Sequence, residues 1–308
     1  MKSELQYKRM RRVSYEEYKQ FIKSRDSVII EDAQVKLQKE WNIKRYQPDN
    51  YIPEEWTVWS FPDRGDWATH VGNYRGNWSP YVPRNLIERY TKPGDLVCDP
   101  MMGSGTTLVE CKLTGRNAIG VDINPDAVMV AMNRLDFKYE TLDHSYKEPK
   151  IELFVGDARN LDAIEDNQVD LIATHPPYCS IIPYTKSKIE GDISSLSIEG
   201  FMEAMSEIAK EFYRILKDGG HCAILIGDTR KHKHYVPIHV GVLEKFLNAG
   251  FVLREDIIKL QHKTKITRER WRGHEYDFYK IAHEHLYVFR KLAKDEKLSD
   301  YKYSTKWW

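Results

Sequence analysis

From residue 93 onward, short apolar segments alternate with helical ones, and this alternation constrains the fold more than any other feature of the chain. The segments 96–99, 117–122 and 151–155 are typical of buried strands, and 106–113 and 124–135 are typical of helices. Strands that alternate with helices form a mainly parallel sheet with helices on both faces. The sequence therefore predicts an α/β, doubly wound fold, in which ligands bind beyond the carboxyl ends of the strands.

The second half of the chain continues this pattern and then changes it. A strand at 169–173 precedes a long amphipathic helix at 199–216, and a strand at 221–226 precedes a helix at 240–248. Two further strands, at 251–260 and 285–289, follow with no helical segment between them. Because parallel strands need a crossover, we expect these last two strands to form an antiparallel hairpin at one edge of the sheet.

The first 92 residues have a different character. Apolar residues at roughly helical spacing predict two short helices, at 14–23 and 31–41, in a highly charged N-terminal extension. The segment 51–92 is rich in Trp, Pro and Gly, which favours loops and short strands. These patterns divide the chain into a helical extension (1–50), a catalytic domain (51–292) and a C-terminal tail (293–308).

Composition narrows the class of protein. The 47 Lys and Arg residues nearly balance the 46 Asp and Glu residues, which excludes a uniformly basic surface but allows a local basic face. The four scattered cysteines contain no CxxC pair, so a disulfide framework is not expected and a reducing cytoplasm is the default. No stretch approaches the 18 apolar residues of a membrane-spanning helix, so we expect no membrane partner.

Acidic residues close three of the predicted strands, and together with a glycine turn they predict a nucleoside cofactor. Asp99 ends the first strand and precedes Gly103-Ser104-Gly105, a turn whose backbone amides can approach a ligand at a helix start. Asp122 ends the second strand, where a carboxylate accepts hydrogen bonds from ribose hydroxyls, and Asp157 ends the third, near an adenine amine. Taken singly, each is better explained as a turn or a helix cap, and only the three together favour a cofactor site.

Thr174-His175-Pro176-Pro177-Tyr178 follows the fourth strand and is the most informative stretch. Consecutive prolines stiffen the backbone, so a carbonyl and a neighbouring polar side chain can accept both hydrogens of an aromatic amine. Two acceptors localise the nitrogen lone pair, and Tyr178 can stack on the base. An ordinary Pro-Pro turn is the alternative, and the cofactor site upstream argues against it.

These segments resemble the motifs of one family. Asp99 to Thr107 resembles the DPxxGSGTT motif of S-adenosylmethionine-dependent DNA amino-methyltransferases, Thr174 to Tyr178 resembles their (D/N/S)PPY motif, and Ser79 to Ile87 resembles their HPxxKPxxL motif. The resemblance covers roughly residues 56 to 290 and implies a seven-stranded, Rossmann-like methyltransferase sheet. It implies the following cofactor-binding residues: Ser79, Pro80, Asp99, Pro100, Gly103, Ser104, Gly105, Thr106, Thr107, Asp122, Ile123, Asp157 and Ala158. It implies these catalytic residues: His175, Pro176, Pro177 and Tyr178.

His175 departs from the family motif, which has Asp, Asn or Ser at this position. An imidazole accepts a hydrogen bond only when it is neutral. Thr174 matches the TSPPY form of cytosine-N4 enzymes, which favours cytosine N4 over adenine N6 as the target on a flipped base of double-stranded DNA. The alternatives are an RNA or tRNA amino-methyltransferase with the same cofactor site and a non-catalytic nucleic-acid-binding module.

Two basic segments are candidates for contact with nucleic acid. One carries an aromatic residue among its charges and comprises Lys263, Lys265, Arg268, Arg270, Trp271 and Arg272; the other contributes Lys231 and Lys233. A solvated loop is the alternative. His232, His234 and His239 lack a suitably spaced acid or cysteine, so no metal is expected. A cognate restriction endonuclease is a candidate partner, and the oligomeric state stays open.

Overall fold

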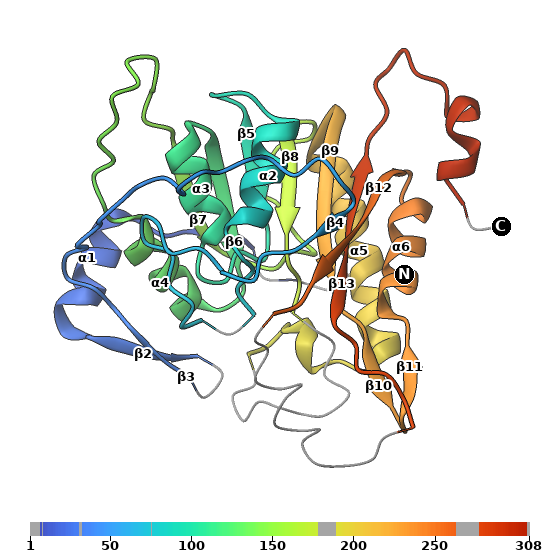
Figure 1. The fold of residues 1–308 in the computed structure, drawn as a ribbon, viewed down its shortest axis with the longest axis horizontal. Coiled ribbons are helices and arrows are strands. Elements are labelled where there is room, and N and C mark those ends of the chain that lie inside the picture. The colour runs from blue at the N-terminus through green and yellow to red at the C-terminus, as the bar shows by residue number, and fades with distance from the viewer. Residues whose placement is uncertain are drawn as a thin grey trace.

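The structure is a computed structural model that describes residues 7, 9–30, 33–74, 76–177, 189–262 and 277–306. Within these residues, one sheet of nine strands runs in the order β1-β7-β6-β5-β8-β9-β13-β12-β4 (Figure 1). The strands are β1 (Arg11–Arg12), β4 (Val58–Trp59), β5 (Leu96–Asp99), β6 (Asn117–Asp122), β7 (Ile151–Val155), β8 (Val169–Thr174), β9 (Leu216–Ile226), β12 (Val252–Leu260) and β13 (His283–Arg290). All seven predicted strands are present, and the two-residue strands β1 and β4 extend the edges.

Strand direction confirms the predicted mixture of parallel and antiparallel pairing. The five strands from β7 to β9 are parallel to one another. β13 inserts beside β9 in the antiparallel sense and pairs with β12 as a hairpin, with His285 opposite Ile226 and Glu284 opposite Lys259. The amino-terminal end of β13 therefore lies at the same edge of the sheet as the carboxyl ends of β8 and β9.

Helices cover both faces of the sheet (Figure 1). The helices are α1 (Tyr15–Ser24), α2 (Tyr81–Tyr90), α3 (Thr106–Thr114), α4 (Pro125–Leu135), α5 (Ile198–Ile215) and α6 (Ile238–Asn248), with 3-10 turns η1 (Ile193–Ser195) and η2 (Leu298–Ser304). Apolar side chains of α2, α3 and α4 join one buried cluster, and those of α5 and α6 join a second. Successive residues of the buried strands contribute to alternate clusters, as the two-residue period of a strand requires.

Two expectations for the N-terminal part were wrong. The segment 31–41, expected to be a helix, instead contributes β3 (Ala33–Lys36) to a hairpin with β2 (Ser27–Ile30). The cause is a two-residue period, since Val35 and Leu37 are buried while Gln34 and Lys36 are exposed. Within 51–92, the helix α2 was not expected. Its prolines, at 80 and 83, occupy the N-cap and first turn, where a missing backbone N–H costs little.

A smaller correction concerns β9. The Asp-Gly-Gly segment at 218–220 was expected to separate a helix from a strand at 221–226, but it lies within β9, which begins at Leu216. A register shift between Val169 and Leu171 of β8 accommodates the longer strand. Among the helices of the described part of the chain, none is both long and apolar enough to cross a membrane.

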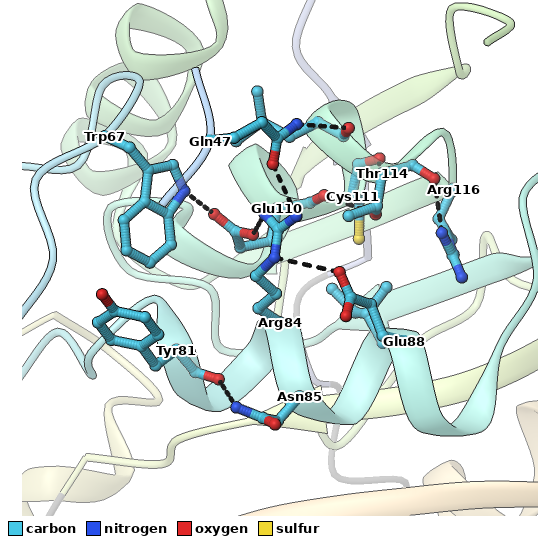
Figure 2. Close-up of polar contacts among 12 residues, drawn as sticks. Gln47, Trp67, Tyr81, Arg84, Asn85, Glu88, Glu110, Cys111, Thr114 and Arg116 are labelled. Atoms are coloured by element: carbon cyan, nitrogen blue, oxygen red, sulfur yellow. Dashed lines mark hydrogen bonds and ion pairs between the residues drawn. The ribbon is translucent and has the colours of Figure 1, made fainter. Parts of the chain in front are cut away.

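A buried carboxylate on α3 holds α2 and the Trp-rich segment against the sheet. Figure 2 shows Glu110, which is fully buried, accepting hydrogen bonds from Trp67 Nε1 at 2.8 Å and Arg84 Nη1 at 2.9 Å. His70 Nε2 lies 2.6 Å from the same carboxylate. Arg84 also reaches Glu88 through Nε at 3.1 Å. Two segments, the Trp-rich segment and α2, are thus fixed on one helix that begins directly after the glycine turn.

Replacing Glu110 should cost much more stability than replacing its neighbour in the same network. Glu110→Ala leaves the buried Arg84 guanidinium without its main counter-charge, and we expect the free energy of unfolding to fall by about 3–5 kcal/mol. Glu88→Ala removes a partly exposed contact with the same arginine and should cost less than about 1 kcal/mol. Urea unfolding of both variants measures this, and equal losses would contradict the assignment.

Candidate cofactor and catalytic site

The glycine turn between β5 and α3 is shaped for close approach of backbone amides. Gly103 and Gly105 have φ angles of +51° and +79°, which residues other than glycine rarely adopt. A Cβ on Gly105 would also lie 2.9 Å from the Cβ of Ala131 on α4. The first turn of α3 follows directly, and Thr106 Oγ1 is buried there with no hydrogen-bond partner among the described residues.

Asp99 joins this turn to the proline corner. Its Oδ2 accepts a hydrogen bond from Thr107 Oγ1 at 2.5 Å, and its Oδ1 accepts one from Thr174 Oγ1 at 2.8 Å. Thr107 belongs to the first turn of α3, whereas Thr174 is the last residue of β8, next to His175. Burial raises the pKa of Asp99 to about 6, although both threonine hydroxyls favour its ionised form. The two predicted motifs therefore meet at one edge of the sheet.

Asp122 is held in place by backbone amides at the end of β6. Its Oδ2 accepts from Gly103 N, and its Oδ1 accepts from Asn124 N, each at 2.9 Å. The first bond couples the acid to the glycine turn, and the second couples it to the N-cap of α4. A carboxylate at this strand end, beside a glycine turn, is the group that accepts hydrogen bonds from ribose hydroxyls in Rossmann-like sites. This geometry fits the role that the sequence predicts for Asp122.

Asp157 has a neighbour that the sequence analysis missed. Arg159 folds back on it, donating from Nη2 to Oδ2 at 2.6 Å and from Nε to Oδ1 at 3.0 Å. The same Nη2 reaches the Gly191 carbonyl at 2.9 Å. A Cβ on Gly191 would lie 2.8 Å from Ile123 Cδ1, so this backbone covers two of the predicted cofactor residues. The adjacent Ala158 is buried.

Two other predicted cofactor residues, Ser104 and Ser79, have hydrogen-bond partners within the protein. Ser104 Oγ accepts from Arg134 Nη1 at 2.7 Å, and Ser79 Oγ donates to the Arg64 carbonyl at 2.7 Å. Both serine side chains therefore hold the walls of the site in position. Pro80 occupies the N-cap position of α2. Pro100 is buried and lies between β5 and the glycine turn in the sequence.

His175 lies in an enclosed setting at the end of β8. Its ring stacks on Trp78 with centroids 5.9 Å apart, and its Nε2 lies 3.8 Å from Glu284 Oε1. The other oxygen of Glu284 accepts from Lys259 Nζ at 2.7 Å. Burial lowers the pKa of His175 below its usual value, and Lys259 adds to this effect, while Glu284 and the Gly76 backbone oppose it. The imidazole is therefore neutral at pH 7 and can accept a hydrogen bond.

The remaining predicted residues divide between described and undescribed parts of the chain. Pro176 is buried and Pro177 is half-buried, directly after His175. Lys231 and Lys233 are exposed at a turn between β10 (Thr229–Lys231) and β11 (His234–Val236), and Lys233 Nζ lies 3.4 Å from Asp277. The predictions for Tyr178, Lys263, Lys265, Arg268, Arg270, Trp271 and Arg272 fall outside the described residues.

The strand order and the rim of acids define a Rossmann-like methyltransferase fold with a nucleoside-cofactor site. A family model described as DNA methylase matches residues 2–133 and 169–308. A second, described as an RMKL-like methyltransferase domain, matches residues 89–233. The chain belongs to the family of S-adenosylmethionine-dependent DNA amino-methyltransferases, and its cofactor is S-adenosylmethionine.

Individual relatives cover only parts of the chain. The Type II methyltransferase M.MjaII of Methanocaldococcus jannaschii is 42% identical over 67 residues, or 22% of this chain and 12% of the relative. A tRNA (guanine(10)-N2)-dimethyltransferase of Methanothermobacter thermautotrophicus is 38% identical over 194 residues, or 62% of this chain and 47% of the relative. The chain therefore spans less than half of either relative. A solved S-adenosylmethionine-dependent methyltransferase of Methanosarcina mazei covers 68% of this chain and 98% of its own, with 15% identity and a TM-score of 0.46.

Asp122→Ala should weaken binding of S-adenosylmethionine without unfolding the chain. Loss of a charged acceptor for the ribose should reduce the affinity about 10- to 100-fold. Calorimetric titration with the cofactor measures this effect. Asp126→Ala, four residues further along in the first turn of α4, is the matched control and should bind normally. Equal affinity in the two variants would assign Asp122 to capping alone.

Proposed function

We propose that the protein transfers a methyl group from S-adenosylmethionine to an exocyclic amine of a base flipped out of double-stranded DNA, with cytosine N4 favoured over adenine N6. The observation that carries this proposal is the pair of hydrogen bonds from Thr107 and Thr174 to Asp99. They bring the glycine turn and the proline corner to one place, as transfer between a cofactor and an acceptor requires.

The residues at this place fit the cofactor. The buried Thr106 hydroxyl beside the glycine turn has no hydrogen-bond partner among the described residues, and the Asp122 carboxylate stands at the adjoining strand end. When bound, S-adenosylmethionine supplies an electrophilic methyl group on a sulfonium. Asp122 would accept from the ribose hydroxyls, and Asp157 with Ala158 would border the adenine.

His175 and the Pro176 carbonyl supply the two acceptors for the target amine. Each accepts one N–H, which turns the nitrogen lone pair out of conjugation and toward the methyl group. The amine that receives the methyl group must lose a proton, and the neutral imidazole of His175 would accept it. Tyr178 follows in sequence and, in this proposal, stacks on the face of the base.

The preference for cytosine N4 rests on the residues at the proline corner. Thr174 matches the form found in cytosine-N4 enzymes, and the neutral His175 provides a single uncharged acceptor, as a serine would. Lys231 and Lys233, together with the basic segment 263–272, are proposed to contact DNA phosphates. Lys231 and Lys233 are exposed, and the segment 263–272 is rich in basic residues, which suits contact with phosphates.

One observation favours a second candidate, an amino-methyltransferase acting on RNA. The tRNA (guanine(10)-N2)-dimethyltransferase aligns with 62% of this chain, a larger share than the 22% aligned with M.MjaII. The same pair of acceptors would suit the exocyclic amine of guanine. The choice between DNA and RNA therefore needs a direct assay of the modified nucleoside.

Methyl transfer can be followed to the modified nucleoside. The full chain is incubated with labelled S-adenosylmethionine and either double-stranded DNA or total tRNA, and the nucleic acid is then digested and separated. We expect label in N4-methylcytosine from DNA. Label in N6-methyladenine would keep the enzyme class and overturn the cytosine preference. Label in RNA alone supports the second candidate, and no transfer supports a non-catalytic binding module.

Substitutions at position 175 test the acceptor role. His175→Ala removes one acceptor and should lower kcat about 100- to 1000-fold while the affinity for S-adenosylmethionine persists. His175→Asn places a family residue with a carbonyl acceptor at this position and should recover part of the loss. An alanine variant as active as the asparagine variant would show that the imidazole does not hold the amine.

A further inference from the structure

Three metal-ligating side chains converge on the side of β13 away from the proline corner. Asp228 lies two residues beyond β9, His239 is the second residue of α6, and His285 belongs to β13. One ligand atom from each lies within 4.8 Å of the other two. Two histidines and one carboxylate form a donor set that binds divalent transition metals. Ligand atoms around a tetrahedral ion are about 3.4 Å apart, given bonds of about 2.1 Å. Because each imidazole binds an ion in its own plane and the two rings are stacked, one ring must turn for this set to close on an ion.

The contact between Asp228 and His239 is short but lacks the geometry of a hydrogen bond. Nδ1 of His239 lies 2.6 Å from Oδ2 of Asp228. Nevertheless, Nδ1 is buried and has no hydrogen-bond partner within the described parts of the chain. A bound cation would give Nδ1 of His239 a partner and would neutralise the charge of Asp228. The imidazole rings of His239 and His285 are nearly parallel, with centroids 3.9 Å apart and an interplanar angle of 3°.

A second layer of polar groups orients the three side chains. Asp256 Oδ1 lies 3.0 Å from Nδ1 of His285, and because a carboxylate only accepts, this contact leaves Nε2 as the ligand atom. The Tyr235 hydroxyl donates to Oδ2 of Asp228, and the backbone N–H of His239 donates to Oδ1 at 3.0 Å. Carboxylates that hold the second nitrogen of a histidine are typical of metal sites.

The burial of the cluster suits a resident ion. The Asp228 side chain is 1% exposed, and those of His239 and His285 are 14% and 12% exposed. The cluster is therefore largely enclosed but keeps some contact with solvent. In contrast, His232 and His234, which the sequence analysis considered together with His239, are exposed on the β10–β11 turn. Of those three histidines, only His239 belongs to the cluster. Its partners there are Asp228 and His285.

We propose that Asp228, His239 and His285 bind one divalent transition-metal ion, for which Zn²⁺ is the probe. The ion would connect the start of α6 to the end of β9 and to β13. The neighbouring Glu284 points to the opposite side of β13, toward His175. The proposed ion therefore stabilises this edge of the sheet and takes no part in methyl transfer, so the site is independent of the proposed function.

Metal titration of the full chain tests this site without an activity assay. Protein stripped with a chelator and dialysed is titrated with ZnCl₂ by calorimetry, and with CoCl₂ by visible absorption. We expect saturable binding of one ion per chain, a Co²⁺ spectrum with nitrogen and oxygen ligands, and a higher melting temperature with Zn²⁺. The absence of saturable Zn²⁺ and Co²⁺ binding by the folded wild-type chain would overturn the proposal.

Four variants locate the ion. Asp228→Asn and His239→Gln should each lower the Zn²⁺ affinity at least about 100-fold, whereas Asp256→Asn should lower it about tenfold through His285. His234→Gln is the matched control and should bind Zn²⁺ like the wild type. Circular dichroism checks that each variant is folded. Affinity that survives in Asp228→Asn and His239→Gln, or falls in His234→Gln, would place the metal elsewhere and overturn the assignment.

Discussion

One buried carboxylate holds the two halves of the site together. Asp99 accepts one hydrogen bond from the Thr107 hydroxyl in the first turn of α3. It accepts another from the hydroxyl of Thr174, the last residue of β8. Separating these two elements would break at least one of these hydrogen bonds to a buried carboxylate, which is costly in a protein interior. The same burial raises the pKa of Asp99 to about 6. The distance between the cofactor turn and the proline corner is therefore set by a short rigid link.

His175 has an environment that compensates for its departure from the family motif. An Asp at this position would bring a charge, whereas a histidine is useful as an acceptor only when it is neutral. Burial against Trp78 and the nearby Lys259 ammonium both favour the neutral ring. Glu284 neutralises that ammonium through a 2.7 Å contact, so the buried lysine is accommodated at the same time. The histidine at position 175 and the residues around it are therefore suited to one another.

The central part of the fold follows from local sequence signals. β5, β6 and β7 have the predicted bounds, because each is a short apolar run that ends at an acid or glycine. The β2–β3 hairpin was not predicted, because its short apolar segment fits both a helical period and a two-residue period. The sequence analysis did not predict helix α2, because it took the prolines as a sign of loops. Prolines in the first turn of a helix do not interrupt it.

The site was predictable where its residues are close in sequence and not where the fold assembles them. The glycine turn and the proline corner each form one continuous segment, so their chemistry can be read directly. Glu284 reaches His175 from a strand more than a hundred residues further along the chain, and no local pattern marks it. Arg159 was missed for another reason, because nothing in the sequence indicates that its side chain turns back on Asp157.

The alternation of side chains along β13 has a mechanical consequence. Glu284 extends toward His175, whereas the next residue, His285, packs on His239 on the other side of the strand. A slip of this strand by a single residue would exchange the two sides, withdrawing the glutamate from the proline corner and the imidazole from its partner ring. The register of β13 against β9 and β12 thus fixes both environments together, and neither can be remodelled by moving the strand without disturbing the other.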